Sequence, residues 1–186
     1  MFELSVSIIL TVHKSERLTD NGEAMKKIFE SHLRFTAWAS GRLLEAAAAL
    51  SEEELNRDFK TADKSVVATL AHCFAADRAW FHRVDGTPRA TFISPEDRTL
   101  SVLQDEWPKY WQRWLECLDK ETNESLARPI TFTDLKGKQH TQPLWQILLH
   151  MVNHATHHRG QVSGFLRAMG HVPPQLDLIF YYRQAG

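Results

Sequence analysis

Cysteine is scarce in this sequence, and the two that occur, Cys73 and Cys117, form no CxxC pair and no zinc-finger spacing. A disulfide framework is therefore excluded, and a reducing compartment such as the cytoplasm is expected. An excess of one charge is also missing, because 22 basic and 23 acidic residues leave a net charge of −1 at pH 7. This balance gives no reason to expect a nucleic-acid partner.

Long hydrophobic runs are absent as well. The apolar stretch at the start, MFELSVSIILTV, is interrupted by serines and lacks the basic region that begins a signal peptide. It is also much shorter than the roughly 20 residues that cross a bilayer, so we expect neither a signal peptide nor a membrane anchor. We interpret residues 1–24 as an N-terminal extension and residues 25–186 as one domain, with Met25 as a candidate alternative start.

Helical periodicity covers most of this domain. Long helices are predicted at 25–50, at 65–84, from 94 to about 119, and at 143–169, with a short helical turn after Ser51. Pro108 should kink the third helix or mark a broken turn, and the apolar tail 172–184 should pack back on the domain. Residues 130–141 are typical of a small β-hairpin that turns at Gly137. The predicted fold is all-α, a four-helix bundle with a small β-hairpin before the last long helix.

The most informative stretch is 148–161, LLHMVNHATHHRGQ, which holds four of the ten histidines of the chain. On a helical wheel of about 100° per residue, His154 and His158 lie with the apolar stripe of the last long helix. His150 and His157 turn toward solvent on the same wheel. His154 and His158 are one turn apart, and this HxxxH spacing lets two imidazoles bind one metal ion.

A third ligand is expected from another helix, because two histidines are too few for a stable metal site. His72 is the best candidate, since it lies opposite the bulky face of the second helix, the face to which Cys73 belongs. The residues around His72 are small: Ala68, Ala75, Ala76 and Ala79. The alternative is that each inward histidine is a core residue satisfied by a hydrogen bond, and HxxxH also occurs by chance in a His-rich chain.

Several stretches together carry a family resemblance. They are WQILLHMVNHATHHRGQ at 145–161, GHVPP at 170–174, DLIFY at 177–181, LAHCFAADRAW at 70–80 and FTAWA at 35–39. In these stretches the chain resembles the DinB/YfiT-like family of metal-binding four-helix proteins, over about residues 25–183. The resemblance implies one divalent ion per chain, commonly zinc or nickel, bound by His72, His154 and His158. It also implies a homodimer.

The resemblance extends to chemistry. Three neutral histidines leave the fourth position of zinc open, which is the arrangement of catalytic sites. Characterised relatives include thiol-S-transferases and a thiol-dependent isomerase that use small thiols such as bacillithiol or mycothiol. The implied activity is therefore metal-dependent transfer with a small thiol as the activated substrate. A metal-dependent hydrolase that activates water is the second hypothesis, and a non-catalytic, stress-related metal-binding protein is a third.

No general base stands out, so the catalytic residues stay unassigned. His157 and Gln161 are candidates for orienting water near the ligands, and His150 is a candidate for a supporting position around them, although surface positions are the simpler interpretation. Arg159 and Asp77 fall on apolar helix faces, and a buried charge needs a partner. We therefore expect these two residues to pair across the bundle.

Overall fold

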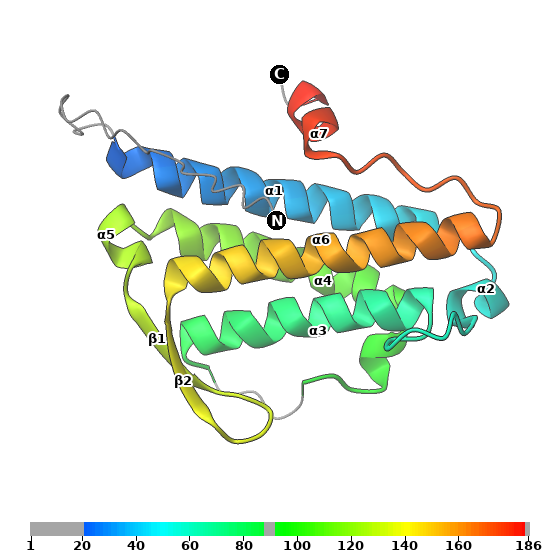
Figure 1. The fold of residues 1–186 in the computed structure, drawn as a ribbon, viewed down its shortest axis with the longest axis horizontal. Coiled ribbons are helices and arrows are strands. Elements are labelled where there is room, and N and C mark those ends of the chain that lie inside the picture. The colour runs from blue at the N-terminus through cyan, green and yellow to red at the C-terminus, as the bar shows by residue number, and fades with distance from the viewer. Residues whose placement is uncertain (1–20, 88–91, 185–186) are drawn as a thin grey trace, which may run out of the picture.

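Figure 1 shows the computed structural model, which describes residues 21–87 and 92–184. The long helices are α1 (Asn21–Ala48), α3 (Val66–Asp85), α4 (Leu100–Asp119) and α6 (Leu144–Ala168). The shorter elements are α2 (Glu52–Asn56), the 3-10 helix η1 (Glu96–Arg98), α5 (Asn123–Leu126), α7 (Leu178–Gln184) and the antiparallel strands β1 (Pro129–Thr133) and β2 (Gln139–Pro143). The predicted four-helix bundle with a small hairpin is confirmed. Most of the predicted N-terminal extension lies outside the described residues, and α1 begins slightly before the expected start at Met25.

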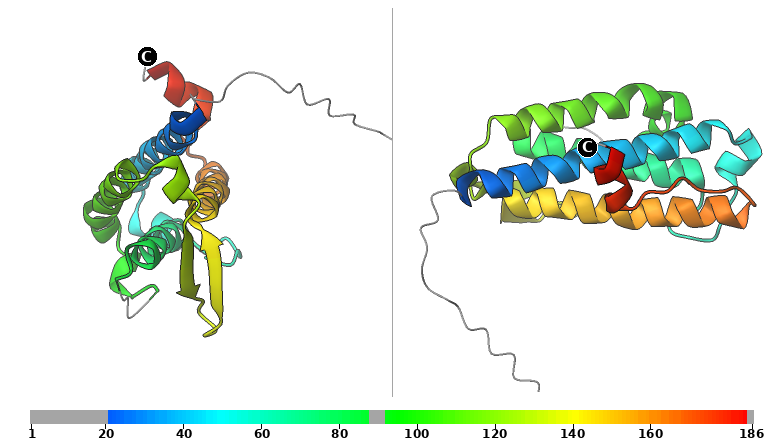
Figure 2. Two further views of the ribbon diagram at one scale, coloured as in Figure 1. Left: turned by 90° about the vertical axis from the view of Figure 1, so that its left-hand side faces the viewer. Right: turned by 90° about the horizontal axis from the view of Figure 1, so that it is seen from above.

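The four long helices surround one core in the order α1, α4, α3, α6, as the end-on view in Figure 2 shows. α1 and α6 run in one direction, and α3 and α4 run in the other (Figure 1). The β1–β2 hairpin follows α5 and leads directly into α6. None of the helices in the described part of the chain has both the length and the apolar character of a membrane span.

Helix boundaries occur at residues suited to them. The Ser65 side chain caps the start of α3, and the helix stops at Gly86, whose φ of 77° lies in the left-handed region that glycine tolerates. Pro143 directly precedes α6, and Gly170, with a φ of 88°, follows its end. These residues explain why the boundaries of α3 and α6 agree closely with the predicted ones.

Aromatic residues of α4 fill the centre of the bundle. Trp107 and Trp114 are almost fully buried, and the Trp107 ring lies 6.2 Å from the ring of Phe74 on α3. α4 continues through Pro108 as one helix, so the alternative of a broken turn is wrong. Trp107 and Trp114, on either side of Pro108, are buried and both donate hydrogen bonds to Asp77 of α3, and such packing stabilises a helix that has lost one backbone bond.

The two short helices α5 and α7 are not predicted by the sequence pattern, because four and seven residues give too little periodicity. α7 nevertheless confirms the prediction that the tail packs back on the domain, since it lies against α1 (Figure 2). The Tyr181 ring is 5.8 Å from Phe35 and 5.6 Å from Trp38, and Ser31 donates a hydrogen bond of 3.1 Å to the Tyr182 hydroxyl.

Asp77 and Arg159 are buried as predicted, with 3% and 5% of their surface exposed. The structure describes both residues and does not join them in the expected ion pair. Asp77 Oδ2 accepts a hydrogen bond of 2.8 Å from Trp107 Nε1. Arg159 Nη2 donates to Thr156 Oγ1 at 2.9 Å, and its guanidinium lies 5.0 Å from the centre of the Phe35 ring. The pairing prediction was wrong because a helical wheel gives the face of a residue and not the partner that reaches it first.

Burial without a direct cationic partner makes Asp77 a titrating core residue. Desolvation raises the pKa of Asp77 to about 7, and the Trp107 hydrogen bond and the Arg159 charge oppose this rise. The folded protein thus holds a proton that the unfolded chain, with an ordinary pKa of 3.8, releases. The resulting contribution to stability is fully present below about pH 4 and is lost as the pH rises through about 7.

Asp77→Asn should remove this pH dependence, because an amide oxygen accepts the Trp107 hydrogen bond but does not titrate. Relative to wild type, the free energy of unfolding of the variant should rise by on the order of 2 kcal/mol between about pH 5 and pH 8. Denaturant unfolding of both proteins at the two pH values measures this change. The histidines are the same in both proteins, so their titration cancels from the comparison. A difference independent of pH would contradict the raised pKa of Asp77.

Candidate metal site

Three histidines meet where α3 packs against α6. His72 comes from α3, and His154 and His158 come from successive turns of α6. The ring centres lie 5.0 Å apart for His72 and His154, 4.7 Å for His72 and His158, and 4.4 Å for His154 and His158. One ring nitrogen from each residue lies within 4.8 Å of the other two. The structure thus brings together the three histidines that the sequence singles out.

The arrangement of these rings is compatible with a divalent ion. Zinc–nitrogen bonds of about 2.0–2.1 Å at tetrahedral angles place two ligand nitrogens about 3.3 Å apart. The Nε2 atoms of His72 and His154 are 3.0 Å apart. Burial lowers the pKa of His154 to about 3 and lowers that of His158, and neighbouring imidazoles add to both effects. His154 and His158 are therefore neutral at pH 7, which is the form that binds a metal.

Gln161 selects the tautomer of His158. Its Oε1 lies 2.6 Å from His158 Nδ1, so this nitrogen carries the proton and donates the hydrogen bond. Nε2 of His158 then keeps a free lone pair. A 3.0 Å separation also suits a direct hydrogen bond between His72 and His154, so the convergence of all three ring nitrogens is the feature that indicates a metal site. Gln161 therefore orients the ring of a candidate ligand, and its expected action on water stays a prediction.

Asp63 is the residue that the sequence reasoning missed. It lies in the loop between α2 and α3, with Oδ1 3.6 Å from His72 Nδ1 and Oδ2 3.8 Å from His158 Nδ1. A carboxylate behind two ligand imidazoles orients the rings and increases their basicity. Its signal in the sequence is weak, because an acidic residue just before a helix cap is common. The loop is fixed by Phe59, whose ring stacks on Phe165 of α6 at 4.3 Å.

His150 and His157 flank the cluster on exposed positions, as the wheel predicts. The His150 ring is 5.7 Å from His154, and the His157 ring is 4.9 Å from His158. Neither belongs to the group of three whose nitrogens converge. Phe92, which the sequence does not single out, borders the cluster on another side, 5.9 Å from the His72 ring.

Cys73 lies in the hydrophobic core, away from the cluster, as predicted, and burial raises the pKa of its thiol well above the usual value. Four further described histidines contact other groups: His32 the Ile28 carbonyl, His82 the Tyr110 hydroxyl, His140 Asp134, and His171 Glu54. His13 lies outside the described residues. In the described part of the chain, the candidate metal ligands are therefore the three histidines of the cluster between α3 and α6.

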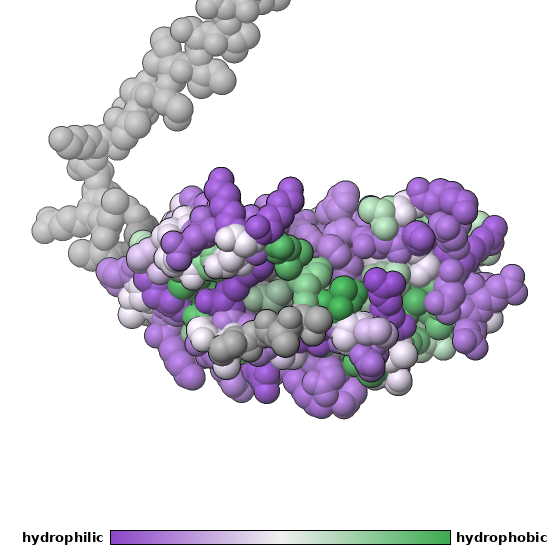
Figure 3. Space-filling model, turned by 90° about the horizontal axis from the view of Figure 1, so that it is seen from below, coloured by the Kyte–Doolittle hydropathy of each residue, from purple (hydrophilic) through white to green (hydrophobic). Residues whose placement is uncertain are grey.

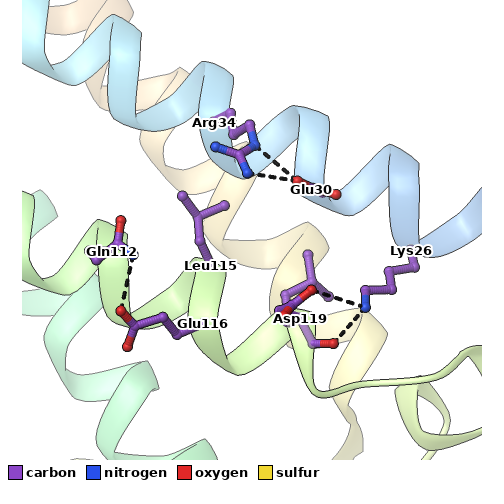
Figure 4. Close-up of a pocket in the computed structure, with 8 residues that line it drawn as sticks. Lys26, Glu30, Arg34, Gln112, Leu115, Glu116 and Asp119 are labelled. Atoms are coloured by element: carbon purple, nitrogen blue, oxygen red, sulfur yellow. Dashed lines mark hydrogen bonds and ion pairs between the residues drawn. The ribbon is translucent and has the colours of Figure 1, made fainter.

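Apart from the histidine cluster, a groove of about 250 Å³ lies between α1 and α4 (Figure 4). Its charged side chains are already paired. Arg34 binds Glu30 at 2.8 Å, and Lys26 donates to the backbone oxygen of Asp119 at 2.6 Å. Because α1 and α4 supply none of the three histidines, this groove is not the candidate site.

Asp63→Asn should lower metal affinity by about 10–100-fold, because the amide keeps the shape but loses the charge behind His72 and His158. Competition with a coloured chelator measures the affinity. Asp58→Asn is the matched control, since Asp58 lies in the same loop and pairs with Lys60 instead. Equal affinities for wild type and Asp63→Asn would show that the carboxylate does not act on the site.

Comparison with known proteins identifies the family of this chain. Residues 25–185 match the model of the DinB family. Protein DinB from Bacillus subtilis (strain 168) is 20% identical over an alignment of 155 residues, and the match covers 79% of this chain and 89% of that protein. The crystal structure of a DinB-like protein from Bacillus cereus ATCC 10987 has a TM-score of 0.58 at 18% identity, covers 80% of this chain and 95% of its own, and supports the fold alone. The chain therefore belongs to the DinB family.

Proposed function

We propose that this protein is a metal-dependent enzyme that binds one zinc or nickel ion per chain through His72, His154 and His158. The observation that carries the proposal is the convergence of three imidazole nitrogens. On the far side of two of these rings, Asp63 faces His72 and the Gln161 amide contacts His158. No fourth histidine, cysteine or acidic side chain joins them in the described part of the chain. Three protein ligands with one free position are typical of catalytic metal sites, whereas structural sites use four.

The residues of the chain prepare the site in three ways. Burial keeps His154 and His158 neutral, Gln161 fixes the proton of His158 on Nδ1, and Asp63 faces the Nδ1 atoms of His72 and His158. A divalent ion held there would act as a Lewis acid that lowers the pKa of a bound thiol or water. The activated nucleophile that we favour is a small thiol, as the family resemblance implies. A homodimer in the cytoplasm is part of the same proposal.

Metal content tests the ligands. Wild type should carry about one equivalent of zinc or nickel after reconstitution, and alanine at any one of positions 72, 154 and 158 should abolish tight binding. His150→Ala and His157→Ala are the controls and should keep the metal, because both side chains lie outside the converging group. Elemental analysis gives the stoichiometry, and circular dichroism checks that each variant stays helical. Stoichiometric metal in His158→Ala would overturn the assignment.

Cobalt substitution distinguishes the candidate activities. Addition of a small thiol to the Co²⁺-loaded protein should produce a sulfur-to-cobalt charge-transfer band, because the free position would accept a thiolate. The band should be missing in His154→Ala. A cobalt spectrum that responds to pH but not to thiol would favour the hydrolase. A spectrum that responds to neither would favour the non-catalytic metal-binding protein.

A further inference from the structure

A pocket of about 410 Å³ lies between α1, α6 and the tail segment 170–177, which connects α6 to α7. Seen from above in Figure 2, this segment and α7 lie along α1 and α6. Figure 3 shows the opposite side of the molecule, where hydrophobic residues occupy much of the centre. The pocket differs from that side because two arginines, Arg159 and Arg167, belong to its lining. None of the three histidines of the candidate metal site lines it.

Contacts at both ends hold the tail segment in place. Near its start, the His171 amide donates to the Leu166 carbonyl at 2.9 Å, and His171 Nε2 lies 2.8 Å from a Glu54 carboxylate oxygen. Beyond its end, the Tyr181 ring lies 5.8 Å from the ring of Phe35, which lines the pocket. The pocket is therefore preformed, and a ligand would have little chain to order when it binds.

Arg159 brings an unpaired hydrogen-bond donor to this pocket. Its guanidinium lies 5.0 Å from the centre of the Phe35 ring, and Nη2 donates to the Thr156 hydroxyl at 2.9 Å. Phe35 and Thr156 both line the pocket, so the guanidinium lies beside it. Only 5% of the surface of Arg159 is exposed, and its Nη1 has no hydrogen-bond partner within residues 21–87 and 92–184. A buried donor without an acceptor is costly, and it indicates a partner that completes the site.

The rest of the lining favours an anion as this partner. Arg159, Ser163 and Arg167 follow one another at four-residue intervals, so they lie in one row along α6. Arg167 is exposed and makes no ion pair with any described residue. Asp177 is the one acidic residue of the lining, and its side chain is exposed. Two guanidinium groups against one carboxylate leave the pocket with an excess of positive charge.

Gly160 keeps space open beside Arg159. Glycine inside a helix is less stable than alanine, and a Cβ at position 160 would meet no atom within 4 Å. Packing among the described residues thus does not require a glycine at this position of the pocket wall. Gly164, one turn later, is equally unobstructed but does not line the pocket. The two glycines therefore form a matched pair for testing where a ligand binds.

We propose that this pocket is an anion-binding site for the phosphate group of a small organic ligand, with Arg159 and Arg167 as its cationic donors. A phosphate monoester carries a charge of about −1.5 to −2 at pH 7 and three acceptor oxygens. Two guanidinium groups with the Ser163 hydroxyl between them suit these oxygens. A carboxylate has one charge and two oxygens and would use fewer of the donors. Phe35 and Leu176 supply an apolar wall for the organic part of the ligand.

Isothermal titration of the full chain tests the ligand class, with inorganic phosphate, phenyl phosphate and acetate as probes. Phenyl phosphate should bind more tightly than inorganic phosphate, because its ring contacts the apolar wall. Acetate should bind about tenfold more weakly than inorganic phosphate, because it has less charge and fewer acceptor atoms. His154→Ala should bind all three probes as wild type does, since the histidine cluster does not line the pocket.

Charge variants test the role of the arginines. Arg167→Gln should weaken the binding of phenyl phosphate about tenfold, which is a typical loss for a charge-assisted hydrogen bond. Arg113→Gln is the matched control on the exposed side of α4, where Arg113 lies 5.0 Å over the Tyr110 ring, and it should leave binding unchanged. Asp177→Asn should strengthen binding about twofold, because it removes the one like charge from the lining.

The glycine pair tests the location without changing a charge. Gly160→Leu fills the pocket and should weaken the binding of phenyl phosphate about tenfold or more, whereas Gly164→Leu should leave it unchanged. Leucine favours a helix over glycine, so both variants should stay helical, which circular dichroism checks.

Four results would overturn the proposal. The first is wild type that binds neither phosphate compound, and the second is binding that survives in both Arg167→Gln and Gly160→Leu. The third is binding that is lost in His154→Ala and kept in Arg167→Gln, which would place the phosphate at the histidine cluster. The fourth is acetate that binds as tightly as inorganic phosphate, which would reject the assignment to phosphate.

Discussion

The close contact of α3 with α6 is the constraint that creates the site. The side of α3 that carries His72 is made of small residues, and Ala75, Ala76 and Ala79 are all buried. Small side chains let two helices approach closely and leave room for rings between them. Antiparallel packing then sets His72 opposite the two turns of α6 that hold His154 and His158. A bulky residue among these alanines would separate the ligands without touching any of them.

The helical periodicity of the sequence was sufficient to predict much of this arrangement. Hydrophobic spacing located the long helices, and Ser65, Gly86 and Gly170 marked their ends. The wheel of the last helix separated His154 and His158 from their exposed neighbours, because helix geometry alone decides which side chains face inward. The alanine pattern around His72 identified the third histidine. Each of these features repeats with the helix and needs no knowledge of its partner.

Features that depend on a partner were missed. Asp63 lies in a loop, and its position behind two imidazoles follows from the stack of Phe59 on Phe165, which no local pattern encodes. Both α4 and α6 border the buried carboxylate of Asp77. The carboxylate accepts its hydrogen bond from Trp107 of α4 and not from Arg159 of α6. Short helices such as α5 depend on their caps and on packing. Prediction from the sequence is therefore weakest where the partner of a side chain depends on a loop or on the detailed packing of two elements.

One of the three histidines is far from the other two along the chain, since His72 and His154 are separated by 82 positions. An unfolded chain brings together only the histidines that are close in sequence, so the complete set of three exists only after α3 and α6 have come together. Any ion that prefers the complete set acts as a crosslink that closes a long loop, and it stabilises the folded chain by mass action. The supply of that metal would then influence how much of this protein persists against proteolysis, independently of any reaction at the site.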